Sequence, residues 1–522
     1  MTVYLCRDAE RLANGPDLAA LAGWLAEREP RAEVRMAPGP CDHPERWLEG
    51  EGTRAERPVL AVCAADGARS ELQARARRLG FDPVAVEIVD LGAASALAHD
   101  RAAATRGARA QLAAALARSR AYRAGQPEST KPVLTWDREV SRRSLFTLPP
   151  IRWDVVPAIR DEACAAGRGC RVCATTCPHG ALAFAGGRMT LGKPQCTGCG
   201  ACVSACPVGA VELPGASLVQ VEAQLDALLA REARDGSPAG ILFLCHASAP
   251  SLARLPRPAA PYPVDWMPVE LPCLGMVTPG WVLQCLAGGA AAVGMLACRS
   301  EDCRFGRRET IAGRLAYCRD VLRALGAPGD AVRFADVTDE RALLEALARP
   351  LAAAAAPDGA AHLDLQPDRG ALAQALGGLA RRHGGAPAPT LDHAESPLGV
   401  VTLAPGCTAC GACALACPTG ALALEHAGAD LSLSFDGARC TACGVCAPVC
   451  PEKVVRLDRR TDLAALARGR QALHRDHVVR CEKCGGPVAT RALLERFRTI
   501  LGGDPALATI SRYCEACRGS IL

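Results

Sequence analysis

Sixteen of the 29 cysteines fall into four short runs, and each run ends in Cys-Pro. Three of the runs have the spacing C-x2-C-x2-C-x3-C-P, which lets a tight loop point three sulfur atoms at one centre. Four thiolates in such runs are the ligands of a [4Fe–4S] cluster, and in paired runs the fourth cysteine serves the cluster of the other run. The sequence therefore predicts four clusters and the chemistry of single-electron transfer.

The crossed pairing assigns each of the sixteen cysteines to one cluster. The first pair of runs gives the sets Cys164, Cys170, Cys173 and Cys206, and Cys196, Cys199, Cys202 and Cys177. The second pair gives the sets Cys407, Cys410, Cys413 and Cys450, and Cys440, Cys443, Cys446 and Cys417. Structural zinc does not require a third and fourth cysteine at these offsets, and disulfides would imply secretion.

The first run departs from the pattern because five residues, not two, separate Cys164 from Cys170. A longer loop costs little closure entropy, so Cys164 can still be a ligand. The alternative is a three-iron cluster that does not use Cys164.

Around residues 155–215 and 397–458 the runs resemble bacterial-type two-cluster ferredoxins. That resemblance implies two compact ferredoxin-like domains.

A second group of cysteines follows predicted strands. Residues 1–125 and 216–345 alternate strand and helix patterns, which predicts two parallel α/β sheets. Cysteines stand at corresponding strand ends of both segments: Cys6, Cys41 and Cys63 in the first, and Cys245, Cys273 and Cys298 in the second. Ligands bind beyond the carboxyl ends of such strands. Because only the second segment adds a fourth cysteine, Cys303, we expect a [2Fe–2S] cluster on Cys245, Cys273, Cys298 and Cys303. Packing as small buried hydrophobic residues is the alternative, and it is the interpretation that we prefer for Cys285 and Cys318.

The tail carries two C-x2-C pairs, Cys481 with Cys484 and Cys514 with Cys517. Two such pairs suit tetrahedral zinc, although the gap between them exceeds that of a usual zinc ribbon. A further iron–sulfur cluster or a redox-active cysteine pair would also be compatible with this spacing.

These signals predict a multidomain chain of the α/β and α+β classes. Two small parallel-sheet α/β domains alternate with two ferredoxin-like 2[4Fe–4S] domains, and a zinc-ribbon-like tail with four cysteines follows. The expected boundaries are 1–125 (α/β), 126–150 (linker), 151–215 (ferredoxin), 216–345 (α/β), 346–396 (Ala/Pro/Gly-rich linker, partly helical), 397–460 (ferredoxin) and 461–522 (tail).

Composition narrows the functions further. The formal charge is +5, but each oxidised cluster with its thiolates carries roughly −2, so a loaded chain would be acidic and no nucleic acid is expected. No apolar stretch reaches the length of a membrane span, and the N-terminus lacks the layout of a signal peptide. Reduced, metal-binding cysteines without a leader predict the cytoplasm. No G-x-G-x-x-G follows a strand, so no flavin is expected, and no catalytic constellation of residues appears.

Two further resemblances point to a redox complex. Residues 241–337, with PCLGMV at 272–277 and ACRSEDCRFG at 297–306, resemble the delta subunit of methyl-viologen-reducing hydrogenase. That family carries a [2Fe–2S] cluster and passes electrons from hydrogenase to heterodisulfide reductase. Residues 1–120, with VYLCRD, GPC and VLAVCAADGARSE, resemble the N-terminal domain of the heterodisulfide reductase A subunit.

The resemblances imply an electron-transfer subunit of an oxidoreductase complex. Its partner would be a hydrogenase or dehydrogenase subunit, in a heterodisulfide-reductase-like complex or with formate dehydrogenase. Two alternatives are a reductase with its own thiol or disulfide substrate site near Cys6, Cys41 and Cys63, and an accessory or assembly factor for a metalloenzyme such as formate dehydrogenase.

Overall fold

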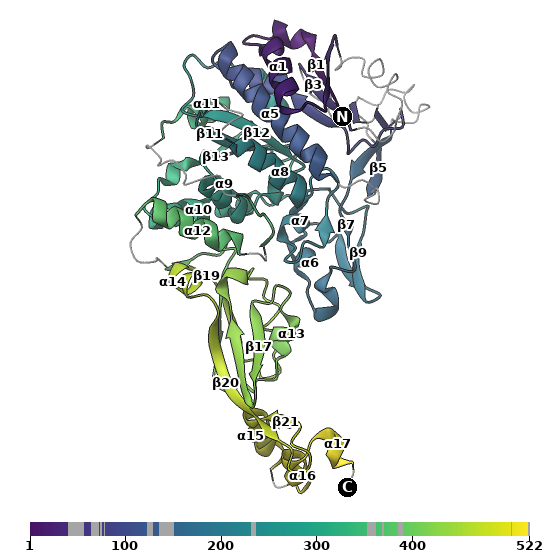
Figure 1. Ribbon diagram of the computed structural model, residues 1–522, viewed down its shortest axis with the longest axis vertical. Coiled ribbons are helices and arrows are strands. Elements are labelled where there is room, and N and C mark those ends of the chain that lie inside the picture. The colour runs from purple at the N-terminus through teal and green to yellow at the C-terminus, as the bar shows by residue number, and fades with distance from the viewer. Residues whose placement is uncertain are drawn as a thin grey trace.

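The computed structural model describes residues 1–39, 57–63, 72–73, 76–77, 79–122, 129–134, 151–230, 236–351, 362–367, 370–384, 390–502 and 504–519. Cys41 lies outside these ranges. Figure 1 shows a broad body that contains both parallel sheets and the first ferredoxin-like domain. The second ferredoxin-like domain lies below this body, and the C-terminal tail forms a narrow end. Among the described residues, none of the helices has the length and apolar character needed to cross a membrane.

The N-terminal domain is built on a parallel four-stranded sheet with the order β2-β1-β3-β4. Its strands are β1 (Thr2–Cys6), β2 (Glu33–Ala37), β3 (Val59–Val62) and β4 (Glu87–Asp90). Its helices are α1 (Leu18–Arg28), α4 (Leu91–Ala96) and α5 (Arg101–Ala121). Every residue of β1 is buried, as expected for a central strand covered on both faces. The parallel sheet predicted for this segment is confirmed.

The second α/β domain repeats this topology, with the parallel order β12-β11-β13-β14. Its strands are β11 (Ala239–Cys245), β12 (Asp265–Leu271), β13 (Ala290–Ala297) and β14 (Val332–Asp336). Its helices are α8 (Leu218–Leu229), α9 (Pro279–Ala287), α10 (Arg308–Ala324), α11 (Glu340–Ala348) and α12 (Ala371–Arg382). Ser217 caps α8 by accepting from the backbone N–H of Gln220, and Pro279 opens α9.

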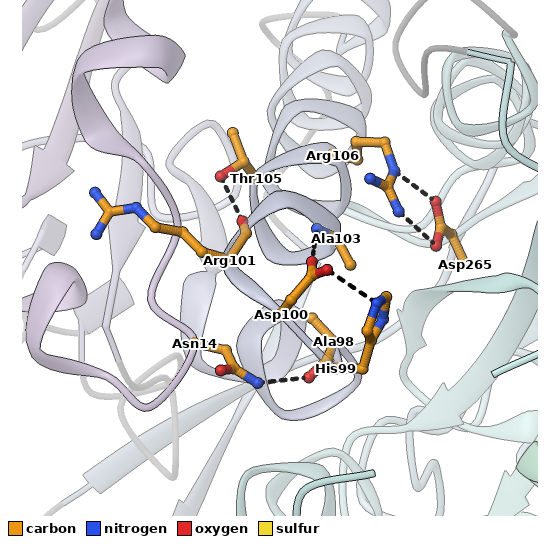
Figure 2. A network of polar contacts seen from close by, with 9 residues as sticks. All are labelled: Asn14, Ala98, His99, Asp100, Arg101, Ala103, Thr105, Arg106 and Asp265. Carbon is orange, nitrogen blue, oxygen red and sulfur yellow. Dashed lines mark hydrogen bonds and ion pairs between the residues drawn. The ribbon is translucent and has the colours of Figure 1, made fainter. Parts of the chain in front are cut away.

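Helix α5 joins the two α/β domains. Figure 2 shows Asp100 capping its first turn, where the carboxylate accepts from the backbone N–H of Ala103 at 2.7 Å. One turn later Arg106 reaches Asp265 at the start of β12, with an Nε–Oδ2 distance of 3.1 Å. Near the helix end Arg118 pairs with Glu87 at 3.2 Å and donates to the Gln224 side chain at 2.7 Å. These partly buried contacts fix the relative position of the two sheets.

The first ferredoxin-like domain is small and made of short elements. Its strands are β6 (Ile151–Val155), β7 (Ala158–Ile159), β8 (Leu182–Ala185), β9 (Arg188–Leu191) and β10 (Val211–Glu212). Its helices are η3 (Ala165–Arg168), α6 (Val172–Thr176) and α7 (Ala201–Ala205). The expected linker of residues 126–150 contributes strand β5 (Thr130–Leu134), which pairs antiparallel with β6.

The second ferredoxin-like domain has longer antiparallel strands. They are β15 (Thr390–Asp392), β16 (Gly399–Leu403), β17 (Leu422–Ala427), β18 (Asp430–Phe435) and β19 (Val455–Asp462). Its helices are α13 (Ala412–Ala416), η9 (Gly437–Arg439) and α14 (Leu463–Arg468). The tail contributes β20 (Gln471–Arg480), β21 (Pro487–Thr490), α15 (Arg491–Leu501), α16 (Ala506–Arg512) and α17 (Glu515–Arg518). Strand β20 pairs with β18, so one sheet continues from the ferredoxin-like domain into the tail.

Candidate functional site: the cysteine centres

Three of the cysteine runs begin with the same tight loop. In C-T-G-C and C-T-A-C the residue before the second cysteine has a positive φ: 68° at Gly198, and 49° at both Ala409 and Ala442. This left-handed turn reverses the chain between the first two cysteines, and a non-glycine residue adopts it only where its surroundings impose it. The loop conformation therefore turns neighbouring sulfur atoms toward a common centre.

The structure groups the sixteen cysteines into four sets of neighbours, which we name sites A to D. Site A is Cys177, Cys196, Cys199 and Cys202; site B is Cys164, Cys170, Cys173 and Cys206; site C is Cys417, Cys440, Cys443 and Cys446; site D is Cys407, Cys410, Cys413 and Cys450. In every set one sulfur comes from the other run of its pair.

Electrostatics reveal these neighbours in the first ferredoxin-like domain. Burial raises the pKa of Cys173 to about 12, and the nearby charges of Cys206, Cys170 and Cys164 contribute to this rise. Cys164 thus belongs to the neighbourhood of site B despite its longer spacing. Burial raises the pKa of Cys202 well above its usual value in the same way, with Cys199 the next contributor.

The second ferredoxin-like domain repeats the arrangement. Burial is the main cause that raises the pKa of Cys413 to about 11, and the charges of Cys407, Cys410 and Cys450 add to this rise. Burial also raises the pKa of Cys446 to about 12, with Cys443 and then Cys417 as the next causes. Ionising four neighbouring, mostly buried thiols is unfavourable when nothing compensates the negative charges. Bound iron compensates these charges and so stabilises the thiolates. The donor sets therefore fit iron–sulfur clusters.

Backbone amides point at several of these sulfur atoms. The N–H of Gly198 donates to Cys196 Sγ at 3.4 Å, and the N–H of Ala210 donates to Cys206 Sγ at 3.2 Å. Amide donors stabilise the charge on sulfur and shift the reduction potential of a bound cluster upward. The ring of His179, two positions after Cys177, is engaged elsewhere, because its Nε2 lies 2.7 Å from the backbone oxygen of Arg304.

The second α/β domain brings Cys245, Cys273, Cys298 and Cys303 together at its strand ends; we name this set the delta site. Hydrogen bonds join its sulfurs, the main ones between Cys298 and Cys245 and between Cys273 and Cys303, with a lesser one between Cys298 and Cys303. The Cys298 thiol donates to the sulfur of Cys245 and lowers the pKa of Cys245 to about 6. The Cys273 thiol donates to the sulfur of Cys303 and lowers the pKa of Cys303 to about 5. In each pair the hydrogen bond stabilises the thiolate form of the sulfur that accepts it.

Two neighbours of the delta site were missed from the sequence. Ser248 is fully buried, and its hydroxyl lies 3.3 Å from Cys245 Sγ and donates to the Leu296 carbonyl at 2.8 Å. The carbonyl of Arg304 accepts from Thr197 at 2.8 Å, which ties the delta site to site A. Ser248 follows Cys245 by three positions, a spacing that could have been noticed. Nothing in the sequence indicates the contact of Arg304.

Comparison with known families agrees with this division of the chain. Residues 241–347 match the family model for the methyl-viologen-reducing hydrogenase delta subunit. Residues 163–210 and 406–454 each match the model for a 4Fe-4S dicluster domain. No curated protein matches the chain. The chain thus combines two 4Fe-4S dicluster domains with a hydrogenase delta-subunit-like domain, and this combination supports an iron–sulfur electron-transfer role.

A cavity of about 410 Å³ lies beside the delta site, where the two α/β domains meet the first dicluster domain. Its wall includes His246 and Pro272, the neighbours of Cys245 and Cys273, together with Arg304, the neighbour of Cys303. Glu270, which pairs with His246 at 2.9 Å, also lines it. The space has the size of a small-molecule site.

The tail holds a compact group of four sulfur atoms. Those of Cys481, Cys484, Cys514 and Cys517 all lie within 4.8 Å of one another. With Zn–S bonds of about 2.3 Å, tetrahedral geometry places sulfur atoms roughly 3.8 Å apart. The donor set therefore fits a single metal ion. In the described part of the chain, no other group of three or more potential ligands is this compact.

Five cysteines lie outside these six sites. Cys285 and Cys318 are fully buried, in agreement with the core packing expected for them. In the N-terminal domain Cys6 receives a hydrogen bond from Cys63, which lowers the pKa of Cys6 to about 6 although burial opposes the shift. Cys6 and Cys63 follow β1 and β3 as Cys245 and Cys298 follow β11 and β13. The third cysteine of the expected set, Cys41, lies outside the described residues.

Proposed function

We propose that the chain relays electrons through four [4Fe–4S] clusters, held at sites A to D, and one [2Fe–2S] cluster at the delta site. The observation that carries this proposal is the crossed grouping of the sixteen cysteines, because it supplies four sets of four neighbouring sulfurs. Bound clusters would supply one-electron chemistry. The chain itself would hold the sulfurs, exclude water by burying most of them and direct amide N–H groups at them.

The arrangement of sulfurs supports different clusters at different sites. In a [2Fe–2S] cluster each iron takes two thiolates, so the ligands form two close pairs. The main hydrogen bonds of the delta site, between Cys245 and Cys298 and between Cys273 and Cys303, support this form, although a lesser one also joins Cys298 to Cys303. In a cubane each iron takes one thiolate, so the four sulfurs stand apart. Sites A to D, whose sulfurs do not form a compact group, suit the cubane.

The tail site suits a structural zinc ion. Its four sulfurs are too close together for a cubane, and they link the loop after β20 to the last helix, α17. A closed site of four cysteines stabilises a small domain that has little core of its own. Leu494 is the one large side chain of α15 that is buried, so the tail has little hydrophobic core to replace the metal.

The delta-subunit-like domain supports a partner of the hydrogenase or dehydrogenase type. We propose a heterodisulfide-reductase-like complex or formate dehydrogenase, with the chain in the cytoplasm. The resemblance of residues 1–120 to the N-terminal domain of the heterodisulfide reductase A subunit agrees with this. The shared sheet order of the two α/β domains makes the first a candidate for docking the same kind of partner.

Metal analysis with EPR on anaerobically purified protein tests the proposal. We expect about four [4Fe–4S] clusters, one [2Fe–2S] cluster and one zinc ion per chain, with iron centres that dithionite reduces. In Cys273→Ala the [2Fe–2S] signal should disappear while the cubane content stays. The matched variant Cys285→Ala removes a buried cysteine outside the site and should keep every signal. Fewer than three cubanes, or clusters that no reductant reduces, would reject the relay and favour an assembly factor.

A second candidate function rests on the cavity beside the delta site. A small disulfide or other electron acceptor bound there would be next to Cys245 and Cys303, so the chain would be a reductase in its own right. Reduction of a small organic disulfide by the purified, dithionite-reduced chain would favour this function. Loss of that turnover in Ala249→Phe, which fills the cavity wall without touching a cysteine, would locate it.

A further inference from the structure

We infer that the redox sites form a single series, delta–A–B–C–D, and that electrons cross between the two dicluster domains only where site B meets site C. This inference rests on the proposed function and adds the route. Neither the family comparisons nor the spacing of cysteines specifies how the four cubane sites are ordered in space. The order follows from which sites share packed side chains.

The delta site adjoins site A. The carbonyl of Arg304, next to Cys303, accepts a hydrogen bond from Thr197 and has His179 Nε2 at 2.7 Å; both residues flank ligands of site A. Gly200 follows Cys199 and is so close to Met276 that a Cβ there would stand 2.4 Å from the Met276 sulfur. The loop of site A is therefore in direct contact with the turn that follows Cys273.

Sites A and B lie on two short helices that pack together, α6 and α7. Cys173 of site B and Cys202 of site A belong to the same buried cluster of side chains. That cluster also contains Cys199, Cys206 and three cysteines of the delta site. The first three sites of the series are thus embedded in one continuous core.

Site B meets site C through a small separate cluster. Ala165 and Cys170 of the first dicluster domain are buried against Ala416 and Val445 of the second. Around them pack Val172 and Val208 from one side, and Cys443 and Val449 from the other. We name these eight residues the junction. It places a ligand of site B, Cys170, in the same cluster as a ligand of site C, Cys443, with apolar side chains and no charged group among its members.

Sites C and D close the series. Their ligands Cys413, Cys417, Cys440, Cys446 and Cys450 share the core of the second dicluster domain. In the described part of the chain, no packed cluster combines a cysteine of site A with one of site C or D. An electron that moves between the halves of the molecule therefore has the junction as its route.

Two variants that keep two cubanes each provide the test. In the first, Cys196, Cys199, Cys202, Cys407, Cys410 and Cys413 are changed to Ala, which leaves only sites B and C. In the second, Cys164, Cys170, Cys173, Cys440, Cys443 and Cys446 are changed to Ala, which leaves only sites A and D. We expect EPR of the dithionite-reduced B–C variant to show magnetic coupling between the two clusters, as splitting or broadening. Both variants also carry Cys273→Ala, because a reduced [2Fe–2S] cluster at the delta site would couple to the adjacent site A. The A–D variant should then show two uncoupled signals.

The outcomes separate this inference from the proposed function. If both variants hold two cubanes by iron and sulfide content but coupling appears in the A–D variant alone, or in neither, the order is wrong and the relay stands. If sites that keep all four cysteines bind no cubane in the otherwise folded chain, the proposed function itself fails.

A second measurement keeps all the cysteines, in case the variants that lack several of them do not fold. Val172→Asp with Val449→Asp places two like charges across the junction. We expect the coupling between the two halves to weaken in the fully reduced holoprotein, with an unchanged iron content. Leu415→Asp is the matched control, because this side chain is 76% exposed on α13 outside the junction, and it should leave the spectrum unchanged. An unchanged spectrum in the double variant would contradict the inference that the two halves of the molecule are coupled through the junction.

Discussion

The sulfur atoms of Cys484 and Cys514 lie 3.5 Å apart, although the two residues are 30 positions apart in the chain. The C-x2-C pairs to which they belong are joined by α15 and α16, whose side chains are largely exposed. Besides a metal ion, the pairs are linked by an exposed ion pair between Arg512 and Glu482 and by a hydrogen bond from the Glu482 N–H to the Arg512 carbonyl, and exposed ion pairs contribute little to stability. The tail is the part of the molecule whose folding should depend most directly on metal.

The first prediction concerns this site. In Cys514→Ala the zinc content should fall from one ion per chain to near zero, and amides of α15 and α16 should lose protection from hydrogen exchange. The iron content should stay the same because sites A to D are separate. Cys318→Ala serves as the control, since it removes a buried cysteine far from the tail in sequence and should keep the zinc. Iron in place of zinc would instead identify a further iron centre.

The second prediction concerns Cys164. If Cys164 is a ligand, the wild-type site B holds four irons, and Cys164→Ala should convert it to a three-iron cluster. Mössbauer and EPR spectra of the oxidised protein distinguish the two forms. A wild-type protein that already contains one three-iron cluster, unchanged in Cys164→Ala, would show that the longer loop leaves this cysteine unused.

Much of the candidate site could be predicted from the sequence, because ligand spacing is a local property. The crossed sets at sites A to D and the strand-end cysteines Cys245 and Cys298 follow from motifs and from strand patterns. Contacts between domains leave no such pattern. The pairing of β20 with β18, the contact of Arg304 with Thr197 and the junction all depend on side chains that look like ordinary surface or core residues in the sequence.

The third prediction concerns the contact between the second α/β domain and the second dicluster domain. The hydroxyl groups of Tyr317 in α10 and Thr461 in β19 lie 2.6 Å apart and are buried. Tyr317→Phe removes this hydrogen bond at a cost of about 1 kcal/mol. Hydrogen exchange of α10 and β19 amides should therefore accelerate about fivefold where exchange occurs by separation of the domains. Tyr513→Phe, a change in the tail, should leave these amides unaffected.

The fourth prediction concerns pH and the N-terminal domain. The pKa of Cys6 is lowered to about 6, chiefly by the hydrogen bond from Cys63, so the folded domain holds the thiolate better than the unfolded chain does. This contribution to stability is complete above the pKa of a free thiol, about 8.5, and is lost as the pH falls through about 6. Protection of β1 amides, corrected for intrinsic exchange, should fall across that range. In Cys63→Ala this pH dependence should flatten, and an unaltered profile would contradict the prediction.

The fifth prediction concerns the end of the series. Of the sixteen cysteines of sites A to D, all of which the structure describes, Cys410 of site D is the exposed one. Solvent and oxidants reach an exposed thiolate first, so site D should lose its cluster before the others on exposure to air. Alkylation with iodoacetamide at successive times, read by mass spectrometry, should label Cys410 and Cys407 early and the buried Cys440 and Cys202 late. The same exposure makes site D the end of the series of redox sites at which an external redox protein can exchange electrons. Earlier labelling at site A would instead indicate that exchange occurs at the opposite end of the series.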